Sequence, residues 1–407
     1  MAEETAMSQR PLRLLVVADT YPPLKMSGAV QMRDLVRGFA DAGHAPTVVE
    51  PTPNLDRPCQ TVSDRGVVTV RVRTAPTKDI GYARRTVNEL RLAGSLMRGM
   101  RRAGLGPAEW DGVVWYSPTI FLGPFARKAK LASGCRSYLI LRDIFPEWAV
   151  DMGLLKRGAA YRFFKWIERR QYAVADTIGV QCEANVSYVQ QLVGPQTSVE
   201  VLENWLSPAP VQACSLDLSQ TRLGGRRLVA YTGNMGIAQG MDVFLDLARS
   251  MAGRSDLGFV FVGRGSEARR LHSAAEQHGL TNVLFHDEVE PCEVPGLLAQ
   301  CEFAIVALDP RHTSHNIPGK FLTYMQAGLP VLARINPGND LERLIREHDV
   351  GRVCIGGDAA TLRAQLEEML ATPGYPARAS QNARALWAGR FSTTTAVSQI
   401  VEALATR

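Results

Sequence analysis

Short apolar runs alternate with amphipathic stretches along nearly the whole chain, and this alternation restricts its fold more than any other feature. In the first half, the runs predicted as strands are 14–18, 45–50, 67–73, 113–116, 138–141, 178–181 and 199–202. In the second half, they are 228–232, 258–262, 283–286, 303–308, 331–333 and 352–355. Helical periodicity, as in 29–42, separates most of them. The alternation is typical of parallel sheets covered by helices, so the sequence predicts an α/β fold.

The alternation is interrupted over 204–227, a polar stretch that contains two prolines and ends in the cluster Gly224-Gly225-Arg226-Arg227. With 407 residues, the chain also exceeds the length at which a single core usually keeps growing. We therefore predict two Rossmann-like, doubly wound domains over 1–205 and 206–380, and a C-terminal helix in 381–407 that returns to the first domain. Such sheets bind ligands beyond the carboxyl ends of their strands, so we expect a site in a cleft where the two sheets face each other.

Composition narrows the classes of partner. The formal charge of +6 and the pI near 9.0 favour anionic partners. No apolar run approaches the roughly 18 residues of a membrane helix, and 1–11 is too polar for a signal peptide, which predicts a cytoplasmic location. The seven cysteines form no C-x-x-C pair, so no metal site is expected. A nucleic-acid role suits the charge but lacks a basic element with interleaved aromatic residues.

An anion site is predicted in the segment 315–330, which lies between the strands predicted over 303–308 and 331–333. Pro318 suits the first turn of a helix, where its missing N–H group has no cost. The exposed N–H groups of that turn attract anions, and Lys320 adds a full positive charge. A strand, a loop and a helix start that carries a lysine together indicate a site for a diphosphate.

Two further strand ends of the second half carry glycines. The residues after 228–232 and 258–262 include Gly233, Asn234, Gly236, Gly263 and Arg264. Glycines let a ligand approach main-chain N–H groups, and Arg264 can bind a phosphate through two parallel hydrogen bonds. The alternatives are an ordinary glycine-rich connection and a solvated arginine in a turn. Three strand ends on one rim suit a nucleotide diphosphate.

Polar residues also follow the strands of the first half. They are Ser27 and Gly28 after the first predicted strand, Ser117 after 113–116, and Asp143 and Glu147 after 138–141. Ser27 and Gly28 could contact substrate oxygens, with a helix cap as the alternative for Ser27. Asp143 and Glu147 could act as bases or bind the hydroxyls of an acceptor. Turn capping by Asp143 and simple surface exposure of Glu147 are the alternatives.

The segment 84–102 predicts a basic amphipathic helix. Its arginines at 84, 85, 91, 98, 101 and 102 alternate with apolar residues. Such a helix can rest on anionic lipid, which predicts a peripheral contact with the inner face of the cytoplasmic membrane. The alternative is a solvated helix face on a helix packed against its own domain.

Three segments of the second half resemble the donor domain of the GT-B glycosyltransferases, a large retaining family that includes sucrose synthase and mannosyltransferases. They are 231–236, 262–265 and 317–331. The segments 115–118, 142–148 and 203–205 are similar to a bacterial branch that builds O-antigens and related surface glycans. Within that branch the chain most resembles the N-acetyl-L-fucosamine transferases. The resemblance, to group 1 or family four of these enzymes, extends from residue 14 to the C-terminal helices.

The resemblance implies a UDP-sugar donor held by 206–380 and a lipid-linked or glycan acceptor held by 1–205. An N-acetylated amino sugar would be transferred with retention and without a metal or other cofactor, in lipopolysaccharide biosynthesis. Lys320 and Arg264 would stabilise the leaving diphosphate, and Asp143 would act on the acceptor. The residues expected to bind the donor are Gly233, Asn234, Gly236, Gly263, Arg264, His315, Lys320 and Thr323, and those expected to bind the acceptor are Ser27, Gly28, Ser117 and Glu147.

The chain departs from the family pattern at four positions. The family's two glutamates, spaced Glu-x7-Glu, fall on His315 and Thr323, and Thr323 could hold ribose hydroxyls only weakly. The family's Arg and Lys after the first donor-domain strand fall on Asn234 and Gln239, which are neutral. We interpret these changes as a pattern of the branch, because Lys320 and the glycine loops persist. A UDP-sugar epimerase of the same fold and a nucleotide-sugar-binding protein without catalysis are the alternatives.

Overall fold

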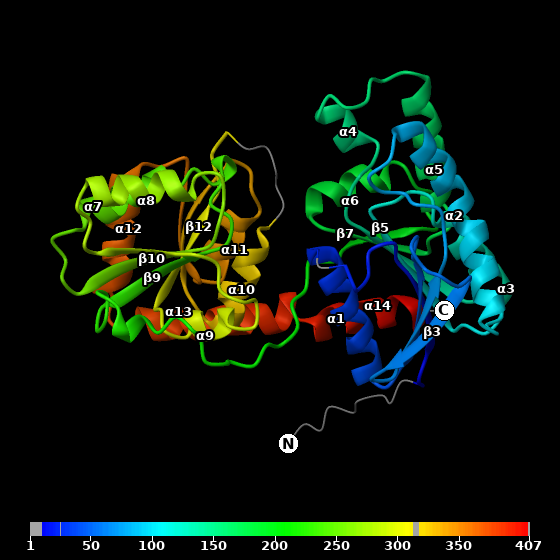
Figure 1. Cartoon of the computed structure of the whole chain (residues 1–407), viewed down its shortest axis with the longest axis horizontal. Coiled ribbons are helices and arrows are strands. Elements are labelled where there is room, and N and C mark those ends of the chain that lie inside the picture. The colour runs from blue at the N-terminus through cyan, green and yellow to red at the C-terminus, as the bar shows by residue number, and fades with distance from the viewer. Residues whose placement is uncertain (1–9, 25, 312–316, 406–407) are drawn as a thin grey trace. The chain divides into compact units, whose positions relative to one another are not determined.

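The computed structural model describes residues 10–24, 26–311 and 317–405. The chain divides into two compact units (Figure 1). Unit 1 combines residues 1–204 with 393–407, and unit 2 comprises 205–392. No helix in the described ranges is both long and apolar enough to cross a membrane. Every strand predicted from the sequence occurs, and both units are α/β, as expected.

Unit 1 contains an eight-stranded sheet of order β3-β4-β2-β1-β5-β6-β7-β8. The strands are β1 (Arg13–Val17), β2 (Ala45–Pro51), β3 (Cys59–Asp64), β4 (Val67–Val72), β5 (Gly112–Ser117), β6 (Arg136–Leu141), β7 (Thr177–Val180) and β8 (Ser198–Val201). All neighbours are parallel except β3, which pairs antiparallel with β4. β3 is not predicted from the sequence, because this edge strand is mostly exposed and lacks an apolar run.

The helices of unit 1 cover both faces of this sheet. They are α1 (Ser27–Asp41), α2 (Tyr82–Arg102), α3 (Gly123–Ser133), α4 (Glu147–Asp151), α5 (Ala159–Tyr172), α6 (Glu183–Gln190) and α14 (Thr393–Ala405). α2, α3 and the end of α5 share one apolar core with the sheet. α14 packs against α1 and β6. α14 approaches α1 closely, because a Cβ atom on Gly38 of α1 would lie 2.8 Å from Thr393 and 2.9 Å from Val397 of α14.

Unit 2 contains a fully parallel, six-stranded sheet of order β11-β10-β9-β12-β13-β14. The strands are β9 (Arg227–Thr232), β10 (Leu257–Val262), β11 (Val283–His286), β12 (Phe303–Ala307), β13 (Val331–Ile335) and β14 (Gly351–Ile355). The chain leaves β9 for β10 on one side and later enters β12 on the other. The strand order therefore reverses between β9 and β12, where sheets of this kind form a crevice for ligands.

Helices cover both faces of the second sheet as well. They are α7 (Asp242–Ser250), α8 (Ala268–Gln277), α9 (Val294–Leu298), α10 (Gly319–Ala327), α11 (Leu341–Glu347), α12 (Ala359–Ala371) and α13 (Tyr375–Leu386), with short helical turns η1 (Leu218–Gln220), η2 (Ile237–Gln239) and η3 (Trp387–Phe391). α7, α8 and α12 share one core with the sheet, and α10, α11 and α13 share another.

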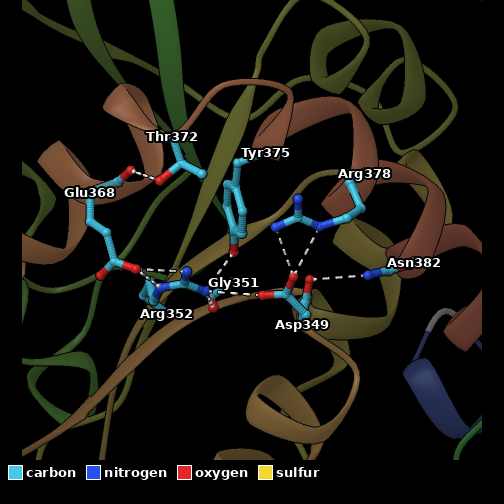
Figure 2. Close-up of polar contacts among 8 residues, drawn as sticks. All are labelled: Asp349, Gly351, Arg352, Glu368, Thr372, Tyr375, Arg378 and Asn382. Carbon is cyan, nitrogen blue, oxygen red and sulfur yellow. Dashed lines mark hydrogen bonds and ion pairs between the residues drawn. The ribbon is translucent and has the colours of Figure 1, made fainter.

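Arg352 joins the edge strand β14 to two of these helices (Figure 2). Its guanidinium donates to Glu368 of α12 at 2.8 Å and to Asp349 at 3.1 Å. It also lies 4.7 Å from the ring centroid of Tyr375 in α13, while Arg378 pairs with Asp349 at 3.2 Å. This cluster lies at the amino end of β14, opposite the edge at which ligand sites form, so we assign it to stabilising the sheet edge.

Candidate functional site

Lys320 lies where the strand order of unit 2 reverses. It is in the first turn of α10, which follows β12, and Pro318 is the residue just before the helix. Its Nζ donates a hydrogen bond of 2.5 Å to the hydroxyl of Tyr231, at the carboxyl end of β9, and lies 3.8 Å from the centroid of that ring. Burial lowers the pKa of Lys320 to about 7. The predicted anion-binding lysine is therefore held at the crevice in a state that is readily deprotonated.

A second contact fixes α10 against the end of β9. The backbone N–H of Thr232 donates to the hydroxyl of Tyr324 at 2.9 Å, and Tyr324 is fully buried. Lys320 and Tyr324 are four residues apart and therefore lie on the same side of the helix. That spacing is visible in the sequence. Both tyrosines, 231 and 324, thus belong to the site and are missing from the predicted residues.

The two glycine loops pack against each other. Gly263 has a φ of 145°, and a Cβ atom there would lie 2.0 Å from the carbonyl oxygen of Gly233. The backbone N–H of Met235 donates to the carbonyl of Arg264 at 2.7 Å. The packing of the loops therefore requires glycine at position 263, which agrees with the alternative of an ordinary glycine-rich connection. Gly233, with a φ of 113°, has open space beside its Cα atom, so a ligand can approach its backbone there.

A pocket of about 350 Å³ opens beside these loops. It is lined by Gly233, Asn234, Gly263 and Arg264, four of the residues expected to bind the donor, and by Val262, Val289 and Leu297. The side chain of Arg264 pairs with Glu288 at 3.1 Å. Because this side chain is 80% exposed, it has room to turn from Glu288 toward an anion. The combination of apolar walls with an exposed guanidinium suits a flat, partly polar ligand such as a nucleoside.

Neutral side chains stand where the family places cations, and they bind each other. The side-chain amide of Asn234 donates to Oε1 of Gln239 at 3.1 Å, and the backbone N–H of Gly236 donates to the same oxygen at 3.0 Å. This loop therefore contributes shape and backbone groups rather than charge. The hydroxyl of Thr323 donates to the carbonyl of Gly319 at 3.4 Å, a long bond within α10. His315 lies outside the described residues.

In unit 1, Ser117 is less accessible than the sequence indicates. Ser117 is fully buried, and its hydroxyl donates to the carbonyl of Thr119 at 3.1 Å and accepts from Gln171 at 3.2 Å. An acceptor cannot reach this hydroxyl, which corrects the role expected for Ser117. The physical reason is that β5 is buried over its whole length, so its last residue faces the core.

Ser27 and Gly28 lie at the start of α1, beyond the end of β1. Ser27 is exposed, and the cap position belongs to Met26, which makes no side-chain cap bond. A Cβ atom on Gly28 would lie 2.8 Å from the hydroxyl of Tyr116, so glycine permits the close approach of α1 to the end of β5. Ser27 is accessible to an acceptor. Glycine at position 28 is explained by its packing against Tyr116, without any contact to an acceptor.

Asp143 and Glu147 have different surroundings although they are four residues apart. Asp143 is exposed, and no ion pair or side-chain hydrogen bond of its carboxylate is found within the ranges that the structure describes. Partial burial raises the pKa of Asp143, and the positive charge of Arg142 opposes that shift. Glu147 is half-buried and accepts hydrogen bonds from Tyr161 at 2.7 Å and Tyr188 at 3.0 Å, and it pairs with Lys165 at 3.1 Å. Burial alone would raise the pKa of Glu147, but these hydrogen bonds hold it below its usual value. The contacts of Glu147 therefore support the fold, and the alternative of simple surface exposure is wrong, whereas contact with an acceptor stays a prediction.

Asp19 is a further candidate that is absent from the predicted residues. It follows β1, which lies between β2 and β5 at the point where the strand order of this sheet reverses. Its carboxylate accepts a hydrogen bond from Thr20 at 3.1 Å. Burial raises the pKa of Asp19, and the positive charge of Lys78 opposes that shift. The residues predicted after the first strand are Ser27 and Gly28, and they omit Asp19 although it follows the same strand end.

Two family models match the chain in succession. Residues 28–205 match the glycosyl transferase 4-like domain, and residues 226–372 match the glycosyl transferases group 1. The chain is 25% identical over 247 residues to the probable glycosyltransferase WbjE of Pseudomonas aeruginosa, an alignment that covers 59% of this chain. It spans only 61% of the length of WbjE.

A second relative and a solved structure agree with these matches. The chain is 22% identical over 275 residues to WcaI of Escherichia coli K12, named for glycosyl transfer in colanic acid biosynthesis, with 65% of this chain and 67% of WcaI covered. The structure of HepE from Anabaena in complex with UDP and glucose superposes with a TM-score of 0.62 at 15% identity, covering 97% of this chain and 99% of HepE. At this identity, the likeness to HepE establishes the fold.

Proposed function

We propose that the chain is a group 1 glycosyl transferase that moves a sugar from a UDP-sugar donor bound by unit 2 to a lipid-linked or glycan acceptor bound by unit 1. The product would be part of a bacterial surface polysaccharide such as an O-antigen, made in the cytoplasm at the inner face of the membrane. The names of WbjE and WcaI support glycosyl transfer, and that of WcaI supports polysaccharide synthesis. The UDP in the HepE complex supports the donor class.

The observation that carries the proposal is the placement of Lys320 and the pocket beside the same strand end. The pocket of about 350 Å³ offers apolar walls for a base, and Gly233 offers open backbone at its edge. Lys320 and the first turn of α10 follow on the other side of β9 and would meet the diphosphate. A donor would then lie across the ends of β10, β9 and β12.

Lys320 would take the role of the family's missing cations. The pKa of its ammonium group, lowered to about 7 by burial, would rise when a dianionic group binds beside it. The lysine would then carry its full charge only in the complex, where it stabilises the leaving diphosphate. Arg264 is exposed and could leave Glu288 for the same anion. This accounts for donor binding despite the neutral side chains of Asn234 and Gln239.

On the acceptor side, Asp143 is the available carboxylate. Because it is exposed and burial raises its pKa, it could accept a hydrogen bond, and then a proton, from an acceptor hydroxyl. We propose transfer with retention at the anomeric carbon and without a metal ion. We further propose an N-acetylated amino sugar, such as N-acetyl-L-fucosamine, as the transferred group.

A panel of nucleotide sugars tests the proposal. The purified protein is incubated with UDP-linked, GDP-linked and ADP-linked sugars, and thermal shifts are followed by assays of transfer to lipid-linked acceptors. We expect a thermal shift with UDP compounds and release of UDP that depends on acceptor. A new nucleotide sugar formed without acceptor would instead identify an epimerase, and a shift with GDP compounds alone would overturn the donor assignment.

A further inference from the structure

Helices α2, α3 and α5 lie side by side on one face of the sheet of unit 1 (Figure 1). Together they carry thirteen basic and two acidic side chains. The two acids, Glu89 and Glu168, are both buried. These helices thus have a net charge of +11, whereas the whole chain has +6. The positive charge of the protein is therefore concentrated on one layer of one unit.

Most of these cations have no carboxylate partner. Among the described residues, ten of the thirteen make no ion pair, namely Arg84, Arg91, Arg98, Arg101, Arg102, Arg127, Lys128, Arg162, Arg169 and Arg170. In unit 2, by contrast, exposed arginines such as Arg254, Arg270 and Arg363 pair with carboxylates within 2.8 Å. Unpaired like charges repel one another, so a surface that keeps them suits an external anion.

Large apolar side chains are exposed among these cations. Leu131 of α3 is 64% exposed, and Trp166 of α5 is 53% exposed. Trp166 stacks on Phe163 with ring centroids 6.4 Å apart, and the guanidinium of Arg170 lies 4.6 Å from its centroid. In the connection from α4 to α5, Met152 is 71% exposed. Exposed apolar side chains that lie among arginines favour a partner with both a charged and an apolar layer.

A groove between α3 and α5 is lined by both basic and apolar side chains. It has a volume of about 340 Å³ and is lined by Arg127, Leu131 and Arg170. Lys130, which also lines it, donates to the carboxylate of Asp176 at 2.8 Å and is already paired. Two unpaired guanidinium groups beside an exposed leucine match a phosphate that has an acyl chain below it.

We propose that the outer surface of α2, α3 and α5, with the connection from α4 to α5, docks on an anionic lipid bilayer. Each basic side chain near such a surface contributes attraction, and tryptophan and phenylalanine partition to the interface. A nucleic acid would use the charges but gives no reason to expose Leu131, Met152 and Trp166. The surface thus differs from the isolated helix predicted over 84–102.

The structure extends the surface beyond that helix. Leu92, Leu96, Met97 and Met100 of α2 are buried against the sheet. The outer side of α2 presents its arginines together with the exposed Tyr82, Val87 and Leu90, and α3, α5 and the connection before α5 add further exposed apolar side chains. The docking extends the proposed function, because a lipid-linked acceptor lies at a membrane, but it can be tested without any sugar transfer.

Co-sedimentation with vesicles tests the proposal. The full chain is mixed with vesicles of phosphatidylcholine alone or with about 30% phosphatidylglycerol, and the bound fraction is measured. We expect binding to the anionic vesicles only, with loss of most binding at about 0.5 M salt. The double variant Arg127→Glu/Arg170→Glu is expected to reduce the partition coefficient at least about tenfold. Trp166→Ser should reduce it severalfold at low salt.

The matched control is Arg269→Glu/Arg343→Glu in unit 2, which changes the net charge equally on another surface and should bind like the unaltered protein. Melting temperatures of all variants show whether each is folded. The salt dependence of binding is measured on the unaltered protein, so it tests the proposal even where a variant does not fold. Equal binding to neutral and anionic vesicles, or equal losses in both double variants, would overturn the assignment. Retained transfer to a water-soluble acceptor by Arg127→Glu/Arg170→Glu separates docking from catalysis.

Discussion

The ammonium group of Lys320 lies 2.5 Å from the hydroxyl of Tyr231 and 3.8 Å from the centroid of the same ring. The hydroxyl of Tyr231 in turn donates to the carbonyl of Asn234 at 2.5 Å, so Lys320 is connected to the glycine loop through one side chain. Neither contact neutralises a positive charge in the way that a carboxylate would. The pair therefore holds the lysine in position for an anion while leaving its charge uncompensated.

Replacing Lys320 by Met should separate activity from stability. Loss of the ammonium group should lower kcat/KM for transfer by about a hundredfold or more, since one charge-stabilising group is typically worth that much. The folded-state pKa of Lys320 is depressed to about 7, so the charge costs stability below pH 7 and this cost disappears as the pH rises toward the unfolded value. The Met variant should thus melt at a higher temperature at about pH 6 and show a smaller gain at about pH 9. Unchanged turnover would sink the proposed role.

Binding of UDP should weaken with pH above neutrality. The diphosphate favours charged Lys320, so binding takes up a proton when the free lysine, with a pKa of about 7, is neutral. Calorimetry should show the Kd rising by up to about tenfold per pH unit between about pH 7 and 9, a window above the titration of the terminal phosphate near 6. Lys320→Arg should bind with little pH dependence there. An equally steep dependence in this Arg variant would contradict the assignment.

Gly263→Ala should destabilise the donor unit. A Cβ atom at this position would lie 2.0 Å from the carbonyl of Gly233, and the φ of 145° is unfavourable for alanine. The loops must therefore separate, at a cost of about 3 kcal/mol or more in the free energy of unfolding, measured in urea. Gly253→Ala is the control, because Gly253 is exposed and a Cβ atom there meets nothing within 4 Å. Similar urea midpoints for the two variants would argue against close packing of the loops.

Lys165→Met should cost more stability than an exposed substitution. Lys165 pairs with Glu147 at 3.1 Å and with the fully buried Glu168, whose carboxylate also accepts from Tyr172 at 3.1 Å. Without the lysine, Glu168 is a buried charge with no counterion, and we expect a loss of about 3–5 kcal/mol in urea denaturation at neutral pH. Lys165→Met/Glu168→Gln should recover part of that loss. No recovery in the double variant would show that the loss has another origin.

A chelator should leave transfer unchanged. The proposed leaving-group stabilisation uses Lys320, Arg264 and the first turn of α10, none of which needs a divalent cation. Rates measured with excess EDTA and with added Mg²⁺ should therefore agree. A rate that depends on Mg²⁺ would require a different arrangement of the diphosphate.

The sequence predicts the strands and the strand-end loops well, because apolar runs and glycines are local signals. It predicts Lys320 correctly at the start of a helix and Arg264 beside the glycines. It misses Tyr231 as a partner of Lys320, because the two are 89 residues apart and only the strand order brings them together. It also misses the partners of Glu147, because Tyr161 and Tyr188 come from other helices. Burial of Ser117 depends on the packing of β5, which the local pattern does not show.

Unit 1 is built from two separated parts of the chain, residues 1–204 and 393–407. During synthesis, the face of α1 that carries Gly38 stays uncovered until α14 leaves the ribosome, after all of unit 2 has been made. Unit 2 can therefore fold while unit 1 is still incomplete, although domains commonly fold in order from the N-terminus. An interrupted chain that ends within unit 2 would release an N-terminal unit with an exposed apolar face, a natural target for chaperones and proteases.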